Sequence, residues 1–455
     1  MRKTPVWLAL IAAWSATAFA QDARTAIDDA TRAMGVSGLT SVTYSGAAAE
    51  GNFGQSRTIS FGLASTSIAS YTFTIDFSQP AARATGLTTP PAGRGMPPPQ
   101  RGTLDRTIAP NAAWPEQFQI WVTPWGFLKG AAANAATMKS QRIEGSAYKV
   151  VTWVPPQKAP SGQPYRVVGY INAENLVDRV ETWVEHPIFG DMHVETRYSN
   201  YRDFGGLRAP TRIAQRKVGM ETFVAGIAVA RANPPDLGQL MAAPSAASAA
   251  APAGPVAAAS EKLSDGVYRI TGGYVALAVE FRDHVVVVEG GESEARGLAV
   301  MAEVKRLFPT KRIKYVVNTH PHFDHAGGLP PFAAEGITIL TDDPSRYFLE
   351  QALRSPRTLV GDGLAKSRRK ATVESVIEKR VLSDGTRSLE LHHLERHEHS
   401  DSMLVAFLPK ERILFTADVE IPAPGQPAGP DYVTLAQNLE RLGITFDRHM
   451  TVHAP

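Results

Sequence analysis

Three histidines and one aspartate fall within six residues of this sequence, and side chains of these types at this spacing can hold metal ions. The stretch reads His320-Pro-His322-Phe-Asp324-His325. His320 and His322 are two positions apart, so an extended backbone aims both imidazoles toward one ion. Asp324 and His325 follow a turn and can face a second ion nearby. Two glycines come next and let the backbone leave the site tightly.

The segments around this stretch predict an α/β fold that places it at the end of a strand. The run from Ile313 to Asn318 has the composition of a strand and ends directly before the histidines. Upstream, residues 283–289 form an apolar run typical of a buried strand, and residues 292–308 carry apolar side chains along one helical face. Strands that alternate with helices predict a sheet covered by helices. Further strands are expected at residues 337–340, 403–408 and 412–415.

The composition restricts both the metal chemistry and the partners. The sequence has no cysteine, which excludes thiolate nucleophiles, disulfides, Cys-ligated zinc and iron–sulfur clusters. A metal site must therefore be built from His, Asp and Glu. The formal net charge is only +3 over 455 residues, which argues against a nucleic-acid-binding protein. We expect a small-molecule substrate and no nucleic-acid partner.

The order of the candidate ligands resembles that of the metallo-β-lactamase superfamily, whose members are αββα sandwiches with metal ions at one edge of two sheets. After the first motif, that family has a His before a strand, an acidic residue after the next strand, and a last His after a late strand. The matching residues here are His399, Asp418 and His453. The resemblance covers about residues 265–455 and implies an αββα sandwich in this half.

The resemblance also implies a role for each side chain. His320, His322 and His399 would hold one metal ion, Asp324, His325 and His453 would hold a second ion, and Asp418 would bridge the two. We expect a tight first site and a weaker second site, because only two residues follow His453 in the sequence and a strand end there would fray. His397 is an alternative ligand to His399, and Asp401 is expected to support His399 through a hydrogen bond.

The ligand set predicts the chemistry that the site would perform. All ligand atoms are nitrogen or oxygen, so zinc is the expected metal. Two zinc ions that share a hydroxide would supply a nucleophile at neutral pH for an ester, lactone, lactam or phosphodiester. Asp324 would orient that hydroxide or accept its proton. Asp418 in place of a thiolate makes the site more similar to the glyoxalase II, lactonase and phosphodiesterase branches than to the Cys-dependent β-lactamases.

Two other functions fit the same residues. The first is a mononuclear iron oxygenase on the same fold, similar to persulfide dioxygenases. The second is a binding protein in which the N-terminal half captures an apolar ligand and the metal site is structural. Metal analysis separates the first from a zinc hydrolase, and ligand titration tests the second.

Residues 1–20 are typical of a signal peptide. Arg2 and Lys3 precede a short apolar run, and Ala18-Phe-Ala20 fits the small-x-small cleavage rule. Cleavage would start the mature chain at Gln21. We therefore expect a periplasmic or secreted protein with no stable membrane insertion.

An Ala-, Pro- and Ser-rich stretch at residues 241–260 predicts a flexible linker between domains at 21–240 and 261–455. Alternation and turn signals in residues 165–215 predict that the first domain is β-rich, with a helix near its start. Residues 79–102 are rich in Pro, Gly and Arg and are expected to form a loop. The five tryptophans that follow the signal peptide all lie in this half, where they fill the core or line an apolar ligand groove.

Overall fold

The structure, a computed structural model, describes residues 22–59, 62–92, 100–242, 256–419, 422 and 425–453. The predicted signal peptide and residues 243–255 of the predicted linker lie outside these ranges. Within them, the strands form one sheet of eleven strands before the linker and two sheets, of seven and five strands, after it. Among the described residues, no helix is long and apolar enough to span a membrane.

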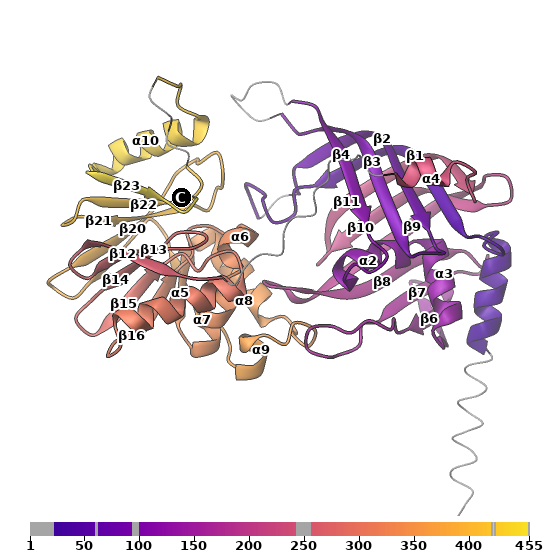
Figure 1. Cartoon of the computed structure of the whole chain (residues 1–455), viewed down its shortest axis with the longest axis horizontal. Helices are drawn as coiled ribbons and strands as arrows, with labels where there is room; N and C mark the ends of the chain where they lie inside the picture. The colour runs from indigo at the N-terminus through magenta and orange to yellow at the C-terminus, as the bar shows by residue number, and fades with distance from the viewer. Residues whose placement is uncertain are drawn as a thin grey trace, which may run out of the picture.

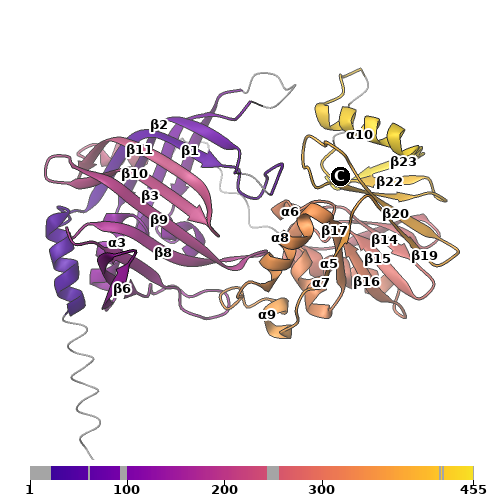
Figure 2. The same cartoon turned by 180° about the vertical axis from the view of Figure 1, so that it is seen from behind.

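The eleven-stranded sheet of the N-terminal half is antiparallel, in the order β4-β3-β2-β1-β11-β10-β9-β8-β7-β6-β5. Strands β1 to β4 form one side of the sheet. The chain then passes through α2 and α3 to the opposite edge. Strands β5 to β11 return from that edge as a meander, and its last strand, β11, pairs with β1. Figures 1 and 2 show the sheet curving around these two helices. The strands are β1 (Ser41–Gly51), β2 (Ser65–Asp76), β3 (Ala81–Thr89), β4 (Gly102–Ile108), β5 (Thr137–Ile143), β6 (Ser146–Trp153), β7 (Val167–Ile171), β8 (Val177–His186), β9 (Gly190–Asp203), β10 (Arg208–Lys217) and β11 (Met220–Ala232).

Helices α2 and α3 place three of the tryptophans, Trp114, Trp121 and Trp125, against the sheet. Both helices begin with a proline in the first turn, where the missing N–H costs nothing. Trp114 and Trp125 are almost fully buried, and the Trp125 ring lies 5.8 Å from that of Tyr44 on β1. These two tryptophans therefore fill the core, which is one of the two roles that the sequence left open. The helices of this half are a first helix at residues 22–33, α2 (Trp114–Trp121), α3 (Pro124–Ala133) and α4 (Leu237–Met241).

The prediction of a loop over residues 79–102 is wrong for β3, which occupies Ala81–Thr89. Ala82 and Ala84 are buried and pair with β2 residues. Small side chains that alternate with Arg and Thr give a weak strand signal, and the proline-rich residues after them dominated the prediction. Residues 93–99 of that stretch lie outside the described residues.

The C-terminal half is an αββα sandwich, as expected from the sequence (Figure 1). Helices α5, α7 and α8 cover the seven-stranded sheet, and α10 covers the five-stranded one. The seven-stranded sheet contains β12 (Ala259–Ser264), β13 (Val267–Thr271), β14 (Ala276–Glu280), β15 (His284–Val288), β16 (Arg312–Val317), β17 (Thr338–Asp342) and β18 (Val373–Val376). The other contains β19 (Lys379–Ser383), β20 (Ser388–His393), β21 (Leu404–Leu408), β22 (Ile413–Thr416) and β23 (Arg448–Thr451). The helices are α5 (Glu294–Leu307), α6 (Phe323–Ala326), α7 (Leu329–Glu335), α8 (Asp343–Arg354), α9 (Gly363–Ser367) and α10 (Pro430–Leu442).

Strand β15 contributes side chains to both hydrophobic cores of this sandwich. Val285 and Val287 belong to the cluster that contains Val300 of α5, whereas Val286 and Val288 belong to the cluster between the two sheets. Successive side chains of a strand point to opposite faces, so an all-valine run suits a strand that is buried on both. The segments after β16, β20, β22 and β23 then leave the sheets and carry the seven candidate metal ligands.

The two halves contact each other through the turn between β8 and β9 and the segment that joins α8 to α9. Arg357 Nη1 donates to the Ile188 carbonyl at 3.0 Å, and the Asp191 carboxylate accepts from the Thr358 backbone N–H at 3.0 Å. A Cβ on Gly190, which has φ 63°, would lie 2.2 Å from the Pro356 carbonyl oxygen. The close approach therefore requires glycine at this position.

Candidate metal centre

Four side chains converge at the end of β16 to form the first group of candidate ligands. Ligand atoms of His320, His322, His399 and Asp418 all lie within 4.8 Å of one another. The Nδ1 atom of His322 is 3.0 Å from His320 Nε2 and 2.9 Å from His399 Nε2. His320 and His322 are buried, whereas the His399 side chain is 25% exposed. Side chains from two sheets thus meet at one point that remains open on one side.

Three further side chains form a second group beside the first. Atoms of Asp324, His325 and His453 lie within 4.8 Å of one another. The His325 side chain is fully buried, but the His453 side chain is 41% exposed. Tyr274 closes one side of this group, because its hydroxyl donates to Asp324 Oδ2 at 3.0 Å and its ring lies 4.4 Å from that of His453.

Asp418 lies between the two groups. Its Oδ2 atom is 3.0 Å from His320 Nε2, 3.0 Å from His325 Nε2 and 2.9 Å from His399 Nε2. Its Oδ1 atom faces His453 Nε2. Burial alone would raise the pKa of Asp418, but the surrounding imidazoles outweigh burial and hold it far below its ordinary value. Asp418 is therefore ionised and in the position of a bridging ligand.

The histidines present lone pairs to the centre because their other ring nitrogens are engaged elsewhere. His322 Nε2 lies 3.0 Å from the Ser56 carbonyl, which can only accept, so Nε2 carries the proton and Nδ1 is left with its lone pair. His325 Nδ1 faces the Glu289 carboxylate at 3.1 Å, which likewise can only accept, whereas His320 Nδ1 lies 3.1 Å from the Thr319 hydroxyl, which can donate or accept. Partners of this kind fix the tautomer of metal-ligating histidines.

The pKa values of these histidines fit a cation site. Burial, with neighbouring imidazoles, lowers the pKa of His322 to about 4 and that of His320 well below its ordinary value. Both rings are therefore neutral at pH 7, as metal ligation requires. Burial also disfavours the charged form of His325, but Glu289 and Asp418 outweigh burial and raise its pKa to about 10. The neutral imidazoles of His320 and His322 beside the ionised carboxylate of Asp418 form a ligand set that suits a divalent cation.

Glu289 is part of the centre, and the sequence analysis missed it. It follows β15, is fully buried, and has φ 74°, a conformation that residues with a side chain rarely adopt. Its Oε1 accepts from the Thr319 backbone N–H at 2.9 Å, and its Oε2 accepts from His325. An acidic residue directly after a buried valine run was the sequence signal that could have identified it.

The N-terminal half also contributes to the centre, through residues 52–59 between β1 and β2, which we call the β1–β2 segment. Gln55 Nε2 donates to Asp324 Oδ1 at 2.5 Å, and Ser56 accepts from His322 as described. Phe53 packs edge-on against Phe323, with the ring centroids 5.0 Å apart. A Cβ on Gly54 would lie 2.2 Å from the Phe323 ring, so only glycine permits this approach. Nothing in the sequence linked this distant segment to the motif.

Arg57 anchors the same segment on the loop that carries His399. Its Nε donates to Asp401 Oδ1 at 2.9 Å, and its Nη1 donates to Glu398 Oε2 at 3.0 Å. The expectation that Asp401 supports His399 is therefore replaced by an ion pair to Arg57. His397, the alternative ligand, is buried and lies outside both ligand groups. All seven side chains that the sequence singled out come together in the two groups.

Comparison with known proteins assigns this half to a family. Residues 271–453 match the model of the metallo-beta-lactamase superfamily. The chain is 26% identical over 194 residues to 2,4-dinitroanisole O-demethylase subunit alpha of Nocardioides sp. (strain JS1661). That alignment covers 42% of this chain and 54% of the relative, so the chain spans about half the length of the curated relative that it matches.

Solved structures of metallo-beta-lactamases resemble part of the chain. The enzyme from Pontibacter korlensis is 18% identical, with a TM-score of 0.33, and the similarity covers 44% of this chain and 92% of that one. DIM-1 metallo-beta-lactamase is 18% identical, with a TM-score of 0.34, and the similarity covers 44% of this chain and 90% of that one. The match to the family model identifies residues 271–453 as a domain of the metallo-beta-lactamase superfamily, and a separate β-rich domain precedes it.

Proposed function

We propose that this protein is an exported metallo-hydrolase that acts on an ester, lactone, lactam or phosphodiester in a small molecule. The observation that carries the proposal is the bridging position of Asp418 between two groups of nitrogen and oxygen ligands. Such ligands favour zinc. Two bound zinc ions would supply a hydroxide nucleophile at neutral pH and polarise the scissile oxygen.

The residues of the chain orient the reacting groups. Gln55 and Tyr274 each donate to one oxygen of Asp324, so the carboxylate is held in a single orientation. From that position Asp324 can accept a proton from the attacking water. Glu289 fixes His325 and Ser56 fixes His322, so the imidazoles do not need to reorganise during the reaction.

The β1–β2 segment supports a role for the N-terminal domain in the same reaction. It covers one side of the metal centre and contacts both ligand groups through Gln55 and Ser56. We propose that this domain shields the substrate from water and restricts which substrates enter. The periplasm or the cell exterior is proposed from residues 1–20, and sequencing of the mature N-terminus should find Gln21 first.

One observation favours a second candidate, a mononuclear iron oxygenase. The first group alone supplies three imidazoles and a carboxylate, and it is better buried than the second group, where His453 is 41% exposed. A chain that held a single ion would hold it in the first group. One iron per chain with oxygen consumption would support this candidate over the hydrolase.

The experiment that tests the hydrolase uses the full chain loaded with zinc and a substrate panel of esters, lactones, β-lactams and phosphodiesters. The name of the O-demethylase relative adds an aryl methyl ether to the panel. We expect hydrolysis of at least one substrate class, and we expect His320→Ala to lose this activity. The control variant, His193→Ala, should retain it, because His193 is a partly exposed residue of β9. Equal rates for the wild type and His320→Ala would refute the proposal.

A further inference from the structure

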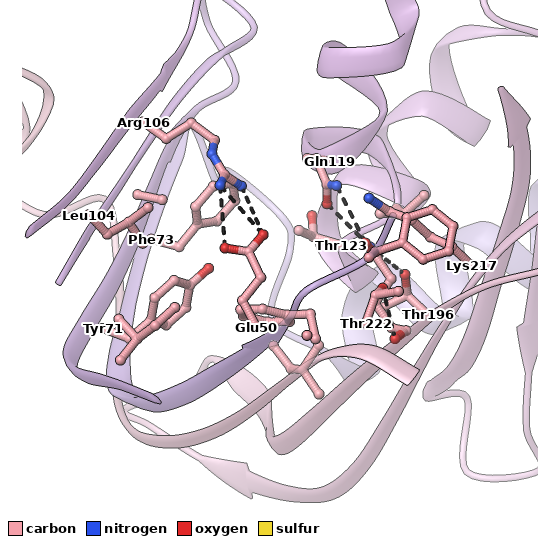
Figure 3. A pocket seen from close by; sticks show the side chains of 18 of the residues that line it. Glu50, Tyr71, Phe73, Leu104, Arg106, Gln119, Thr123, Thr196, Lys217 and Thr222 are labelled. Atoms are coloured by element: carbon pink, nitrogen blue, oxygen red, sulfur yellow. Dashed lines mark hydrogen bonds and ion pairs between the residues drawn. The ribbon is translucent and has the colours of Figure 1, made fainter. Parts of the chain in front are cut away.

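A cavity of about 310 Å³ lies in the N-terminal half, between α2 and one face of the eleven-stranded sheet (Figure 3). None of the seven candidate metal ligands lines it. Its walls come from β1 to β4, from Asn52 and Phe53 of the β1–β2 segment, from α2 and the turn after it, and from β9 to β11. Its volume is at the lower end of the range of roughly 300–1,000 Å³ that is typical of small-molecule sites.

One wall of the cavity is made of aromatic and aliphatic side chains. Tyr71 and Phe223 lie with their ring centroids 5.4 Å apart, and Phe73 lies 5.6 Å from Tyr44. Leu104 on β4 lies beside Phe73 and extends this wall (Figure 3). These side chains offer a continuous apolar surface to the body of a ligand.

The polar side chains of the cavity are mostly paired with one another. Glu50 and Arg106 form an ion pair at 3.3 Å, and both are at least 40% exposed, which places them near solvent. Gln215 donates to Thr196 Oγ1 at 3.1 Å and to Gln119 Oε1 at 3.2 Å (Figure 3). Neither arrangement requires a ligand.

Lys217 is the exception. Within the described residues, no carboxylate lies within ion-pair distance of its ammonium group, which instead lies 5.5 Å from the centre of the Phe53 ring. Burial lowers the pKa of Lys217, although the Glu50 carboxylate opposes this effect and Arg106 adds to it. The three charged side chains of the cavity, Glu50, Arg106 and Lys217, leave a net charge of +1 on its wall. The chemistry that complements this wall is an anion attached to an apolar body.

We propose that this cavity binds a small amphipathic monocarboxylate, with the carboxylate paired to Lys217 and the apolar chain against Tyr71, Phe73 and Phe223. Its size fits one medium-length chain or a single ring system better than a lipid with two acyl chains. The proposal does not rest on the metal chemistry proposed above.

Isothermal titration calorimetry with the zinc-loaded full chain tests the proposal, with decanoate as the probe and decanol as its uncharged analogue. We expect decanoate to bind with one site per chain and at least about tenfold more tightly than decanol. Lys217→Met, which retains the apolar stem, should lower decanoate affinity to the level of decanol. The control is Lys139→Met, which removes the same charge from an exposed position on β5. It should leave decanoate affinity unchanged.

A second variant locates the binding. Leu104→Trp adds volume at the cavity wall on an edge strand, so it should weaken decanoate and decanol together, with the fold checked by circular dichroism. Three results would overturn the proposal: no heat of binding with either probe up to about 1 mM, equal affinities of the wild type for both probes, or decanoate affinity unchanged by Lys217→Met.

Discussion

The replacement Glu289→Gln tests how much the metal centre depends on a side chain that contacts no metal position itself. Glu289 is fully buried and accepts two hydrogen bonds, from the Thr319 backbone N–H at 2.9 Å and from His325 Nδ1 at 3.1 Å. Glutamine has nearly the same shape but only one acceptor oxygen. Its amide NH₂ must therefore face one of the two donors, so one hydrogen bond is lost and a donor–donor contact replaces it.

The expected loss follows from the role of Glu289 in orienting His325. Loss of a partner that orients a metal-bound histidine typically lowers metal affinity about 10- to 100-fold, or about 1.4–2.7 kcal/mol. We expect this loss mainly at the second site, because His325 belongs to the second ligand group. The first site should change less, through the contact of Glu289 with Thr319, which precedes His320.

Zinc competition titration against a chromogenic chelator measures both affinities in one experiment. Glu303→Gln is the matched control, because Glu303 pairs with Arg306 on α5 and makes no contact with the ligand groups. The reasoning is refuted if Glu289→Gln binds the second zinc as tightly as Glu303→Gln does, or if only the first site weakens.

Three further predictions concern the contact between the halves. Burial, with nearby cationic side chains, lowers the pKa of His186 from 6.5 to about 3. Between these pH values the unfolded chain binds a proton at His186 and the folded chain does not. The free energy of unfolding therefore falls as pH drops from 6.5 toward 3. His186→Asn keeps an acceptor for the backbone N–H groups but cannot titrate; urea unfolding should show that it loses about 2 kcal/mol less than the wild type between pH 7 and pH 5, and parallel losses would contradict this. Arg357→Met leaves the buried Asp362 carboxylate unpaired and should cost about 3–5 kcal/mol in thermal or urea unfolding; Arg357→Met with Asp362→Asn should recover part of that loss, and no recovery would show that the ion pair is not the cause. Arg57→Met removes two half-exposed ion pairs, each worth about 0.2–1 kcal/mol, so hydrogen exchange should accelerate at residues 52–59 while the first zinc is retained; unchanged exchange would mean that Arg57 does not anchor the β1–β2 segment.

The features that the sequence predicted well are those with local signals. The spacing of His320, His322, Asp324 and His325 after a strand is a local pattern. The run of valines in β15 is also local, because a strand buried on both faces is apolar at every position. The αββα sandwich was predicted from these patterns and from the resemblance of the ligand order to that of the metallo-β-lactamase superfamily. The alternation in residues 165–215 likewise predicted the meander, because hairpins join neighbouring strands.

The features that the sequence did not predict depend on contacts between distant segments. Gln55 and Asp324 are 269 positions apart, and Arg57 and Asp401 are 344 positions apart. No periodicity reports a contact of that kind, because it depends on how two separately folded sheets meet. Lys217 is similar, since its lack of a carboxylate partner is visible only once the cavity is formed.

The most direct test of the central claim is metal analysis of the full chain, purified without added metal. Two ligand groups joined by Asp418 predict two zinc ions per chain, with the second lost first on dialysis against a chelator because His453 is exposed. A single iron per chain would favour the oxygenase instead. A chain that binds no metal, even after zinc is supplied, would contradict the account.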